Sequence, residues 1–180
     1  MCSEFKQKFQ SGELITRFKL NEYPPKINIG LVRPTDQALI IGANNKAMFL
    51  SWGFKVAWDK KPIINARSET LTKKKTFQAH LGQRCIVPVA SYSEWRNDAG
   101  KKLKNYISPQ AQYFSIAGLI KEDTFTIITC QPTPEIAHIH NRIPVILLPE
   151  AERKWLNPGY IFNNLAHYLE AYNQATMNIQ

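Results

Sequence analysis

The sequence predicts a β-rich α+β fold in which a strongly curved or barrel-like sheet is flanked by short helices. Short runs of β-branched and aromatic residues recur along the chain, and Gly, Pro, Asn or Asp bounds each run. Many short strands favour a closed or strongly curved sheet. The 180 residues predict one compact domain, residues 1–180, because no repeat, low-complexity tract or linker divides them.

Six runs carry the strand pattern, and each has the length and composition of a buried or half-buried strand. They are Ala38–Gly42, Ala47–Phe54, Arg84–Trp95, Tyr113–Ile120, Thr124–Cys130 and Ile143–Leu148.

Helical periodicity appears near the end of the chain. Glu150–Leu156 follows a proline, and Ile161–Tyr172 places its apolar residues on one face. We expect these helices to cover an opening or a flank of the barrel. The Pro24, Pro25 pair and the segment Lys101–Lys104 are expected to lie in surface connections.

The chain is strongly basic, with 23 Lys and Arg residues against 14 acidic ones and a formal net charge of +9. Such a charge favours a polyanionic partner, and nucleic acid is the first candidate. An ordinary alternative is that Lys73–Lys75 and Lys101–Lys104 are only solvated loops. Charge alone does not separate these two interpretations.

The three cysteines form no CxxC or Cys/His ligand spacing, so we expect no metal site, no disulfide framework and no cofactor. The segment Cys2–Gln10 is mixed in charge and lacks an apolar run. It therefore predicts neither a signal peptide nor a membrane anchor, and the expected location is the cytoplasm, with no membrane partner.

Cys2 directly follows the initiator Met1, and removal of Met1 would expose a 1,2-aminothiol. An α-amine has a pKa near ~8, against ~10.4 for lysine, so more of it is an unprotonated nucleophile at neutral pH. Such an amine attacks aldehydes, and the neighbouring thiol can then close a five-membered thiazolidine ring. Taken alone, Cys2 is better explained as an ordinary residue of a frayed terminus.

Several motifs, in this order and spacing, resemble the SRAP (SOS-response-associated peptidase) family over most of the chain. They are the Met1, Cys2 start, the WGxxxxW spacing of Trp52, Gly53 and Trp58, NARSET at Asn65–Thr70, RCIVP at Arg84–Pro88, the pair Glu94 and Trp95, AGL at Ala117–Leu119, TIIT at Thr126–Thr129 and IHNRIPVIL at Ile139–Leu147. The resemblance implies a single SRAP-like domain that binds single-stranded DNA and crosslinks to abasic sites through its N-terminal cysteine.

The resemblance also implies the catalytic residues Cys2, Asn65, Glu94 and His140. Glu94 is expected to shuttle protons, because a carboxyl group in a partly apolar pocket can be tuned for that work. His140 is expected to populate both protonation states near neutrality and to donate to the sugar oxygen. Asn65 would orient the amine and the sugar through hydrogen bonds. Each of these residues taken singly also has an ordinary structural explanation.

DNA contacts are expected from Arg67, Arg84 and Arg142, since each adjoins a catalytic motif and a guanidinium can grip a phosphate bidentately. Trp52, with Trp58 and Tyr92, would offer stacking surfaces to the bases that flank the lesion. Trp58 could stack in this way, but packing in the core is its expected role. The expected partner is a single strand of DNA with an abasic site, bound by a monomer.

The sequence departs from the family pattern at several positions. Ser3 and Glu4 stand where the family has Gly and Arg, so an acid that repels the DNA backbone replaces a basic phosphate contact. The histidine motif is HNRIP rather than HDRMP, with Asn141 and Ile143 at the changed positions, and Ser93 replaces the usual tyrosine before the catalytic glutamate.

Two other functions remain open from the sequence. In the first, the Cys2 thiolate acts as a peptidase nucleophile with His140 as base and cleaves the Met1–Cys2 bond in self-processing. In the second, the chain is a non-enzymatic single-stranded DNA-binding module that retains the family fold without its chemistry.

Overall fold

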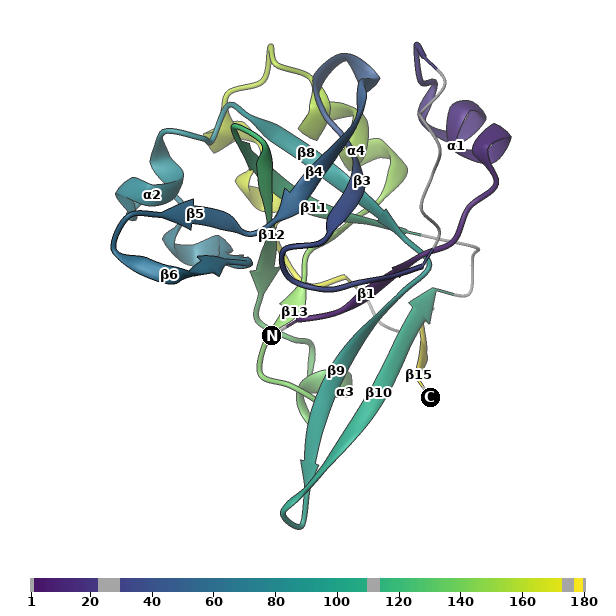
Figure 1. Cartoon of the computed structure of the whole chain (residues 1–180), viewed down its shortest axis with the longest axis vertical. Coiled ribbons are helices and arrows are strands. Elements are labelled where there is room, and N and C mark those ends of the chain that lie inside the picture. The colour runs from purple at the N-terminus through teal and green to yellow at the C-terminus, as the bar shows by residue number, and fades with distance from the viewer. Residues whose placement is uncertain (1, 23–29, 110–113, 173–176, 180) are drawn as a thin grey trace.

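The computed structural model describes residues 2–22, 30–109, 114–172 and 177–179 (Figure 1). In chain order its strands are β1 Phe5–Gln7, β2 Gly30–Val32, β3 Gln37–Ile41, β4 Ala47–Trp52, β5 Phe54–Val56, β6 Asp59–Ile63, β7 Asn65–Arg67, β8 Arg84–Val89, β9 Ser91–Asp98, β10 Lys101–Pro109, β11 Phe114–Lys121, β12 Thr124–Cys130, β13 Ile143–Pro144, β14 Ile146–Leu147 and β15 Met177–Ile179.

Helices are short and lie outside the sheets (Figure 1). They are α1 Ser11–Phe18, α2 Lys75–Gln78, α3 Pro134–Ala137 and α4 Pro149–Leu156, with 3-10 turns at Ala43–Asn45, Ser68–Thr70, Phe162–Asn164 and Ala166–Tyr168. Within the described ranges, no helix has the length and apolar character needed to cross a membrane.

A closed barrel forms the centre of the molecule. Strand β12 pairs with β4, β4 with β3, β3 with β8 and β8 with β11, and β11 returns to pair with β12. The β12–β4 pair is parallel and the other pairs are antiparallel. Closure satisfies the hydrogen-bonding edges of the sheet within the barrel itself. The predicted β-rich fold with a barrel-like sheet and flanking short helices is therefore confirmed.

Large aromatic side chains and close strand contacts fill the barrel. The Trp52 ring lies 4.8 Å from Phe5 and 6.4 Å from Phe125, and its Nε1 donates a hydrogen bond of 2.9 Å to the Ile64 carbonyl. At Gly118, a Cβ atom would lie 2.9 Å from the Cys85 Sγ. Only glycine fits there without displacing its neighbours, which explains the AGL motif.

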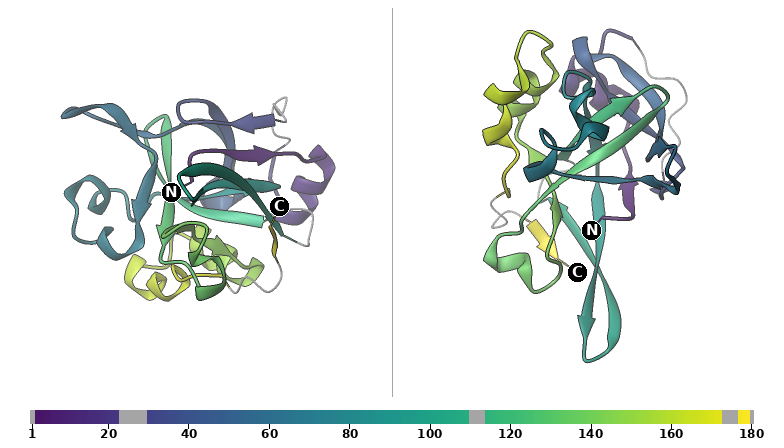
Figure 2. Two further views of the ribbon diagram at one scale, coloured as in Figure 1. Left: turned by 90° about the horizontal axis from the view of Figure 1, so that it is seen from below. Right: turned by 90° about the vertical axis from the view of Figure 1, so that its left-hand side faces the viewer.

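A second sheet has the strand order β15-β10-β9-β1-β2. Its β9–β10 hairpin pairs antiparallel from Tyr92 opposite Ile107 to Asp98 opposite Lys101, and it projects well beyond the barrel (Figures 1 and 2). The expectation that Lys101–Lys104 forms a surface connection is wrong, because these lysines begin strand β10.

Other predicted elements differ in extent. The run Arg84–Trp95 is broken at Ala90, so that β8 joins the barrel and β9 the second sheet. Helix α4 confirms the first predicted helix, whereas Ile161–Tyr172 contains two 3-10 turns instead of one α-helix. Asparagine competes with helical hydrogen bonding, and Asn163 and Asn164 stand near the start of this run. The Pro24, Pro25 pair lies outside the described residues.

Candidate functional site

The four residues predicted to be catalytic meet at the seam between the barrel and the second sheet. Cys2 precedes β1 and Glu94 lies in β9, so both come from the second sheet. Asn65 begins β7 and His140 precedes β13, and both of these strands pair with β12 of the barrel. Strand β12 therefore holds Asn65 and His140 on the side of the seam that faces Cys2 and Glu94.

Cys2 is fully buried and is held by two hydrogen bonds. Asn65 donates from Nδ2 to the Cys2 carbonyl at 2.9 Å, and the Cys2 thiol donates to the Glu4 carbonyl at 3.5 Å. Burial, and after it the negative charge of Glu94, raises the pKa of the Cys2 thiol. At neutral pH the thiol consequently keeps its proton.

Glu94 is a carboxyl group that titrates near neutrality. Its side chain is 1% exposed, and this burial raises its pKa from 4.5 to about 7. Its Oε2 lies 3.9 Å from His140 Nε2, which is too long for a direct hydrogen bond but places the two groups side by side. Glu94 can therefore both give and take a proton at physiological pH.

His140 is held in one tautomer. The main-chain N–H of Arg142 donates to His140 Nδ1 at 3.1 Å, so the proton of the neutral ring is on Nε2, the nitrogen that faces Glu94. Burial lowers the pKa of His140. The structure thus favours a neutral ring that donates from Nε2, rather than the mixture of protonation states expected from the sequence.

Arg142 is buried and forms hydrogen bonds with other residues of the protein. The expectation that it contacts a DNA phosphate is therefore wrong. Its guanidinium binds both carboxylate oxygens of Glu69, with Nη2 at 2.9 Å from Oε2, and Nη2 also donates to the Thr129 carbonyl at 2.6 Å. This clamp ties the turn after Asn65 to the segment that carries His140. Glu69 was not predicted as a site residue, although it lies within the NARSET motif.

Arg84 also has a structural position, and its expected phosphate contact is corrected too. It is 5% exposed, and its guanidinium donates to the carbonyls of Trp155 at 2.6 Å, Leu81 at 3.0 Å, Asn157 at 2.8 Å and Tyr160 at 3.0 Å. These bonds fasten the end of α4 and the following loop to the barrel. A guanidinium occupied in this way has no geometry left for a bidentate phosphate contact.

Arg84→Ala should therefore act on stability and not on DNA binding. Loss of the charge-assisted hydrogen bonds should lower the free energy of unfolding by about 2–4 kcal/mol, measured by urea denaturation. The salt dependence of DNA binding, measured below the melting temperature, should stay unchanged. If Arg84→Ala showed a shallower salt dependence than the wild type, this would indicate that Arg84 contacts a DNA phosphate.

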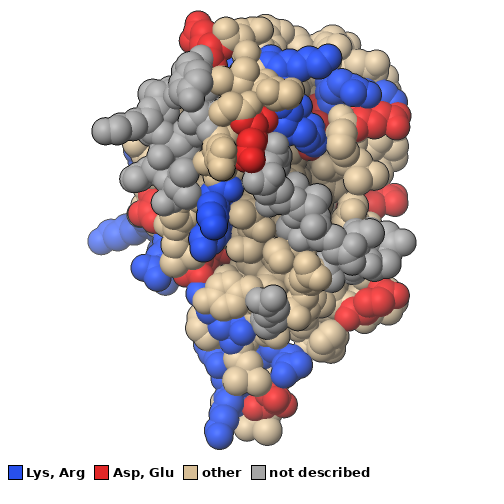
Figure 3. Space-filling model, turned by 90° about the vertical axis from the view of Figure 1, so that its right-hand side faces the viewer, with Lys and Arg blue, Asp and Glu red and all other residues tan. Residues whose placement is uncertain are grey.

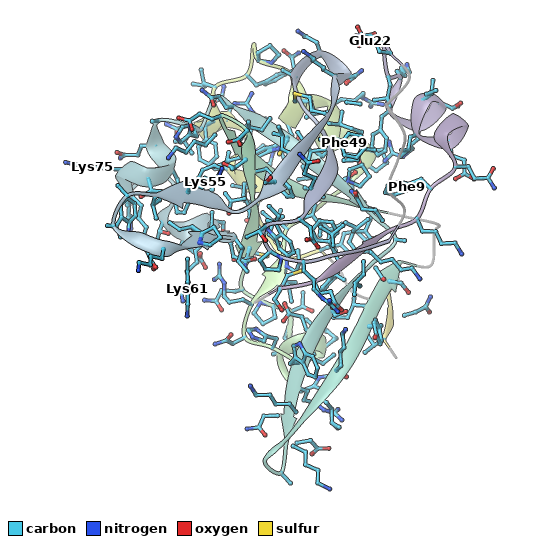
Figure 4. All side chains as sticks on the ribbon, in the orientation of Figure 1. Phe9, Glu22, Phe49, Lys55, Lys61 and Lys75 are labelled. Atoms are coloured by element: carbon cyan, nitrogen blue, oxygen red, sulfur yellow. The ribbon has the colours of Figure 1, made fainter. Side chains whose placement is uncertain are left out.

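The aromatic residues expected to stack on bases are buried, and the tryptophan expected in the core is exposed. Trp52 and Tyr92 are fully buried and cannot stack on a base. Trp58, expected in the core, is 69% exposed in the turn between β5 and β6. Figure 4 shows Lys61 of β6 projecting away from the body of the molecule. Arg67, two residues after Asn65, is exposed and remains a candidate DNA contact.

Glu4 does not present a bare negative charge to DNA. Lys104 and Arg33 form ion pairs with its carboxylate, the latter at 3.3 Å, and Ser93 Oγ donates to it at 3.2 Å. Burial opposes ionisation of Glu4, but the hydrogen bond from Lys104 and those from Arg33 and Ser93 hold its pKa below the ordinary value. Glu4 and Ser93, two of the residues that depart from the family pattern, are thus in contact with each other.

The raised pKa of Glu94 predicts a pH-dependent difference in stability between the wild type and Glu94→Gln. Between pH 4.5 and about 7 the unfolded chain releases this proton while the folded protein retains it, so wild-type stability falls as pH rises. We expect Glu94→Gln to be more stable by about 1–3 kcal/mol at pH 8 and equally stable at pH 4. Thermal melts at both pH values test this, and equal stability at pH 8 would contradict it.

The described residues contain no group of three or more His, Cys, Asp or Glu side chains placed to hold a metal ion. The fold and the site together define a class, that of β-barrel proteins that hold a cysteine from the start of the chain among acid–base side chains. More particularly, the chain belongs to the SOS response associated peptidase (SRAP) family, whose family model matches residues 1–180. The resemblance seen in the sequence is thereby confirmed.

Several curated relatives carry the name abasic site processing protein. YoqW of Bacillus subtilis is 34% identical over 184 aligned residues, which cover 88% of this chain and 81% of YoqW. YedK of Escherichia coli is 29% identical over 140 residues, which cover 69% of this chain and 63% of YedK. A crystal structure of a protein from Bacteroides thetaiotaomicron matches with a TM-score of 0.87 at 24% identity, over 99% of this chain and 90% of that one, which shows a shared fold.

Proposed function

We propose that this protein processes abasic sites in DNA by binding a single strand and forming a thiazolidine crosslink between Cys2, after removal of Met1, and the sugar aldehyde. The observation that carries the proposal is the position of Cys2, buried against Asn65 and close enough for the charge of Glu94 to act on its thiol. The names of the relatives support abasic DNA as the substrate class.

The first step forms an imine. The free α-amine of Cys2, with a pKa near ~8, attacks the C1′ aldehyde of the opened sugar. The carbinolamine then loses its hydroxyl group as water. Glu94, whose pKa of about 7 keeps a protonated fraction at neutral pH, protonates the leaving hydroxyl, and its carboxylate takes back the proton that the nitrogen releases as the neutral imine forms. His140 donates from Nε2 to the sugar oxygen, which stabilises negative charge as the ring opens.

The second step closes the ring. The Cys2 sulfur bonds to the imine carbon, and the thiol proton passes to the imine nitrogen through Glu94. The whole reaction releases one water and needs no oxidant. Asn65 holds the Cys2 carbonyl at 2.9 Å and so limits rotation of the residue, which raises the effective concentration of the thiol.

DNA is bound before the chemistry. Arg67 is exposed beside Asn65 and can contact a phosphate, and Trp58 offers a face on which an unpaired base can stack. Stacking of this kind requires bases that are free of a duplex, which accounts for the preference for single strands. We further propose that residues 1–180 form one domain and that the protein acts as a monomer in the cytoplasm.

Incubation with abasic single-stranded DNA tests the proposal. The wild type should give an adduct that survives a denaturing gel, and little adduct with intact or fully duplex DNA. The self-processing alternative requires a Cys2 thiolate, which burial disfavours. Intact-mass comparison of the wild type and Glu94→Ala decides that alternative, since equal loss of Met1 in both points to a separate aminopeptidase. Absence of any adduct under conditions where DNA binds would overturn the proposal.

A further inference from the structure

The outer face of the second sheet carries a hollow that the proposed chemistry does not use. Its volume is about 310 Å³, and the residues that line it include Lys6, Lys8, Ser91, Ser93, Tyr106 and Ser108. The register explains this set, because Lys6 lies opposite Ser91 and Ser93 opposite Tyr106, so these side chains share one face. Glu94 and Tyr92 alternate with them and point to the opposite face.

This face is basic. Lys6, Lys8, Lys102 and Arg33 are exposed on it, and Lys104 is half-buried beside them. Among the described outward positions of β1, β2, β9 and β10 and the residues directly before and after them, the acid on this face is Glu4, which Lys104 and Arg33 neutralise. The positive charge is therefore a property of the face as a whole (Figure 3, where blue side chains run along the projecting hairpin).

Aromatic rings accompany the charge. Tyr106 and Trp95 are each 46% exposed, and the Lys104 Nζ lies 5.0 Å from the first ring centroid and 5.7 Å from the second. The ion pair with Glu4 fixes the ammonium of Lys104 between these rings. Flat rings interleaved with lysines suit a chain that alternates bases and phosphates.

The face connects with the site at the edge of β9. Strand β1 pairs with β9 at Phe5 and Lys6, and the Ser93 N–H donates to the Glu4 carbonyl at 3.0 Å. Beyond Glu4, β9 has β10 on one side and no strand on the other among the described residues. Cys2 lies at the point where this edge opens, so a strand held at Cys2 can pass over the edge onto the outer face.

We propose that the outer face binds the single strand of DNA that continues from the abasic site. Lys6 and Lys8 contact its phosphates, the hydroxyls of Ser91 and Ser108 donate hydrogen bonds to its phosphate oxygens, and Tyr106 stacks on one base. This inference rests on the proposed function, and it adds to that function a second contact region outside the reactive centre.

Charge reversal tests the inference. The double variant Lys6→Glu, Lys8→Glu is compared with Lys19→Glu, Arg153→Glu, which has the same net charge but changes exposed residues at the ends of α1 and α4. Intact single strands of about 5 and about 20 nucleotides are titrated by fluorescence anisotropy over a range of salt. On the long strand the first variant should bind at least about tenfold more weakly than the control, with a salt slope smaller by about 1.4.

On the short strand, which ends before it reaches the hollow, the two variants should bind alike. A second pair isolates stacking, since Tyr106→Ala should weaken long-strand binding by about tenfold and Tyr106→Phe should not. Equal binding of the long strand by both charge variants, or equal loss in Tyr106→Ala and Tyr106→Phe, would overturn the inference. Because the strands are intact, this result does not depend on crosslinking, and failure of the adduct assay alone would count against the proposed function instead.

Discussion

Cys2→Ser should bind abasic single-stranded DNA as tightly as the wild type and leave no adduct on a denaturing gel. A serine at the start of the mature chain keeps the amine but lacks the sulfur that closes the thiazolidine, so the reaction should stop at the imine. Borohydride reduction should convert that imine into a stable amine link. Gels with and without borohydride therefore separate the two chemical steps.

Cys130→Ser is the matched control, because it removes a buried thiol that the proposed chemistry does not use. Its adduct yield should equal that of the wild type. A denaturation-resistant adduct formed by Cys2→Ser without borohydride would rule out the ring. If the wild type and Cys2→Ala bind abasic DNA equally and neither forms an adduct, the chain is a non-enzymatic binding module.

Glu94→Gln should slow adduct formation by about 10²- to 10⁴-fold, which is the range that a positioned general acid–base contributes. Glutamine keeps the size and polarity of the side chain but cannot exchange a proton. The wild-type rate should change with pH around the Glu94 pKa of about 7, and this dependence should disappear in the variant. Single-turnover rates across pH 5.5 to 8.5 measure both effects.

Glu150→Gln serves as the control for this series, since Glu150 is an exposed carboxylate in the first turn of α4. Its rates should follow those of the wild type at every pH. An unchanged rate in Glu94→Gln at pH 7 would mean that another group moves the proton, and the neutral His140 beside it would be the next to test.

Local patterns were enough to predict much of the fold. The β-branched runs that became β3 and β12 are buried along most of their length, so the apolar signal and the observed strand coincide. The segment Lys101–Lys104 gave the opposite result, because β10 owes its conformation to pairing with β9 rather than to its own composition. That the chain is a single domain remains a prediction.

The site, like the fold, could be predicted from the sequence only in part. Cys2, Asn65, Glu94 and His140 meet as the family motifs imply, since the motifs carry the spacing of the fold. The burial of Arg84 was not foreseeable, because three of its acceptors are main-chain carbonyls more than 70 positions later. Trp52 and Trp58 look alike in the sequence, and only the barrel distinguishes the buried ring from the exposed one.

The full burial of Cys2 has a consequence for the timing of synthesis. Its surroundings are completed by Asn65, Glu94 and the loop at His140, so the pocket cannot exist until most of the polypeptide has left the ribosome. At ~5–20 residues per second this leaves roughly 7–30 s in which the nascent N-terminus is open to an aminopeptidase. Under the proposed function, we therefore expect removal of Met1 to be fastest during translation, and a variant that folds early around its first residues should accumulate as an inert precursor.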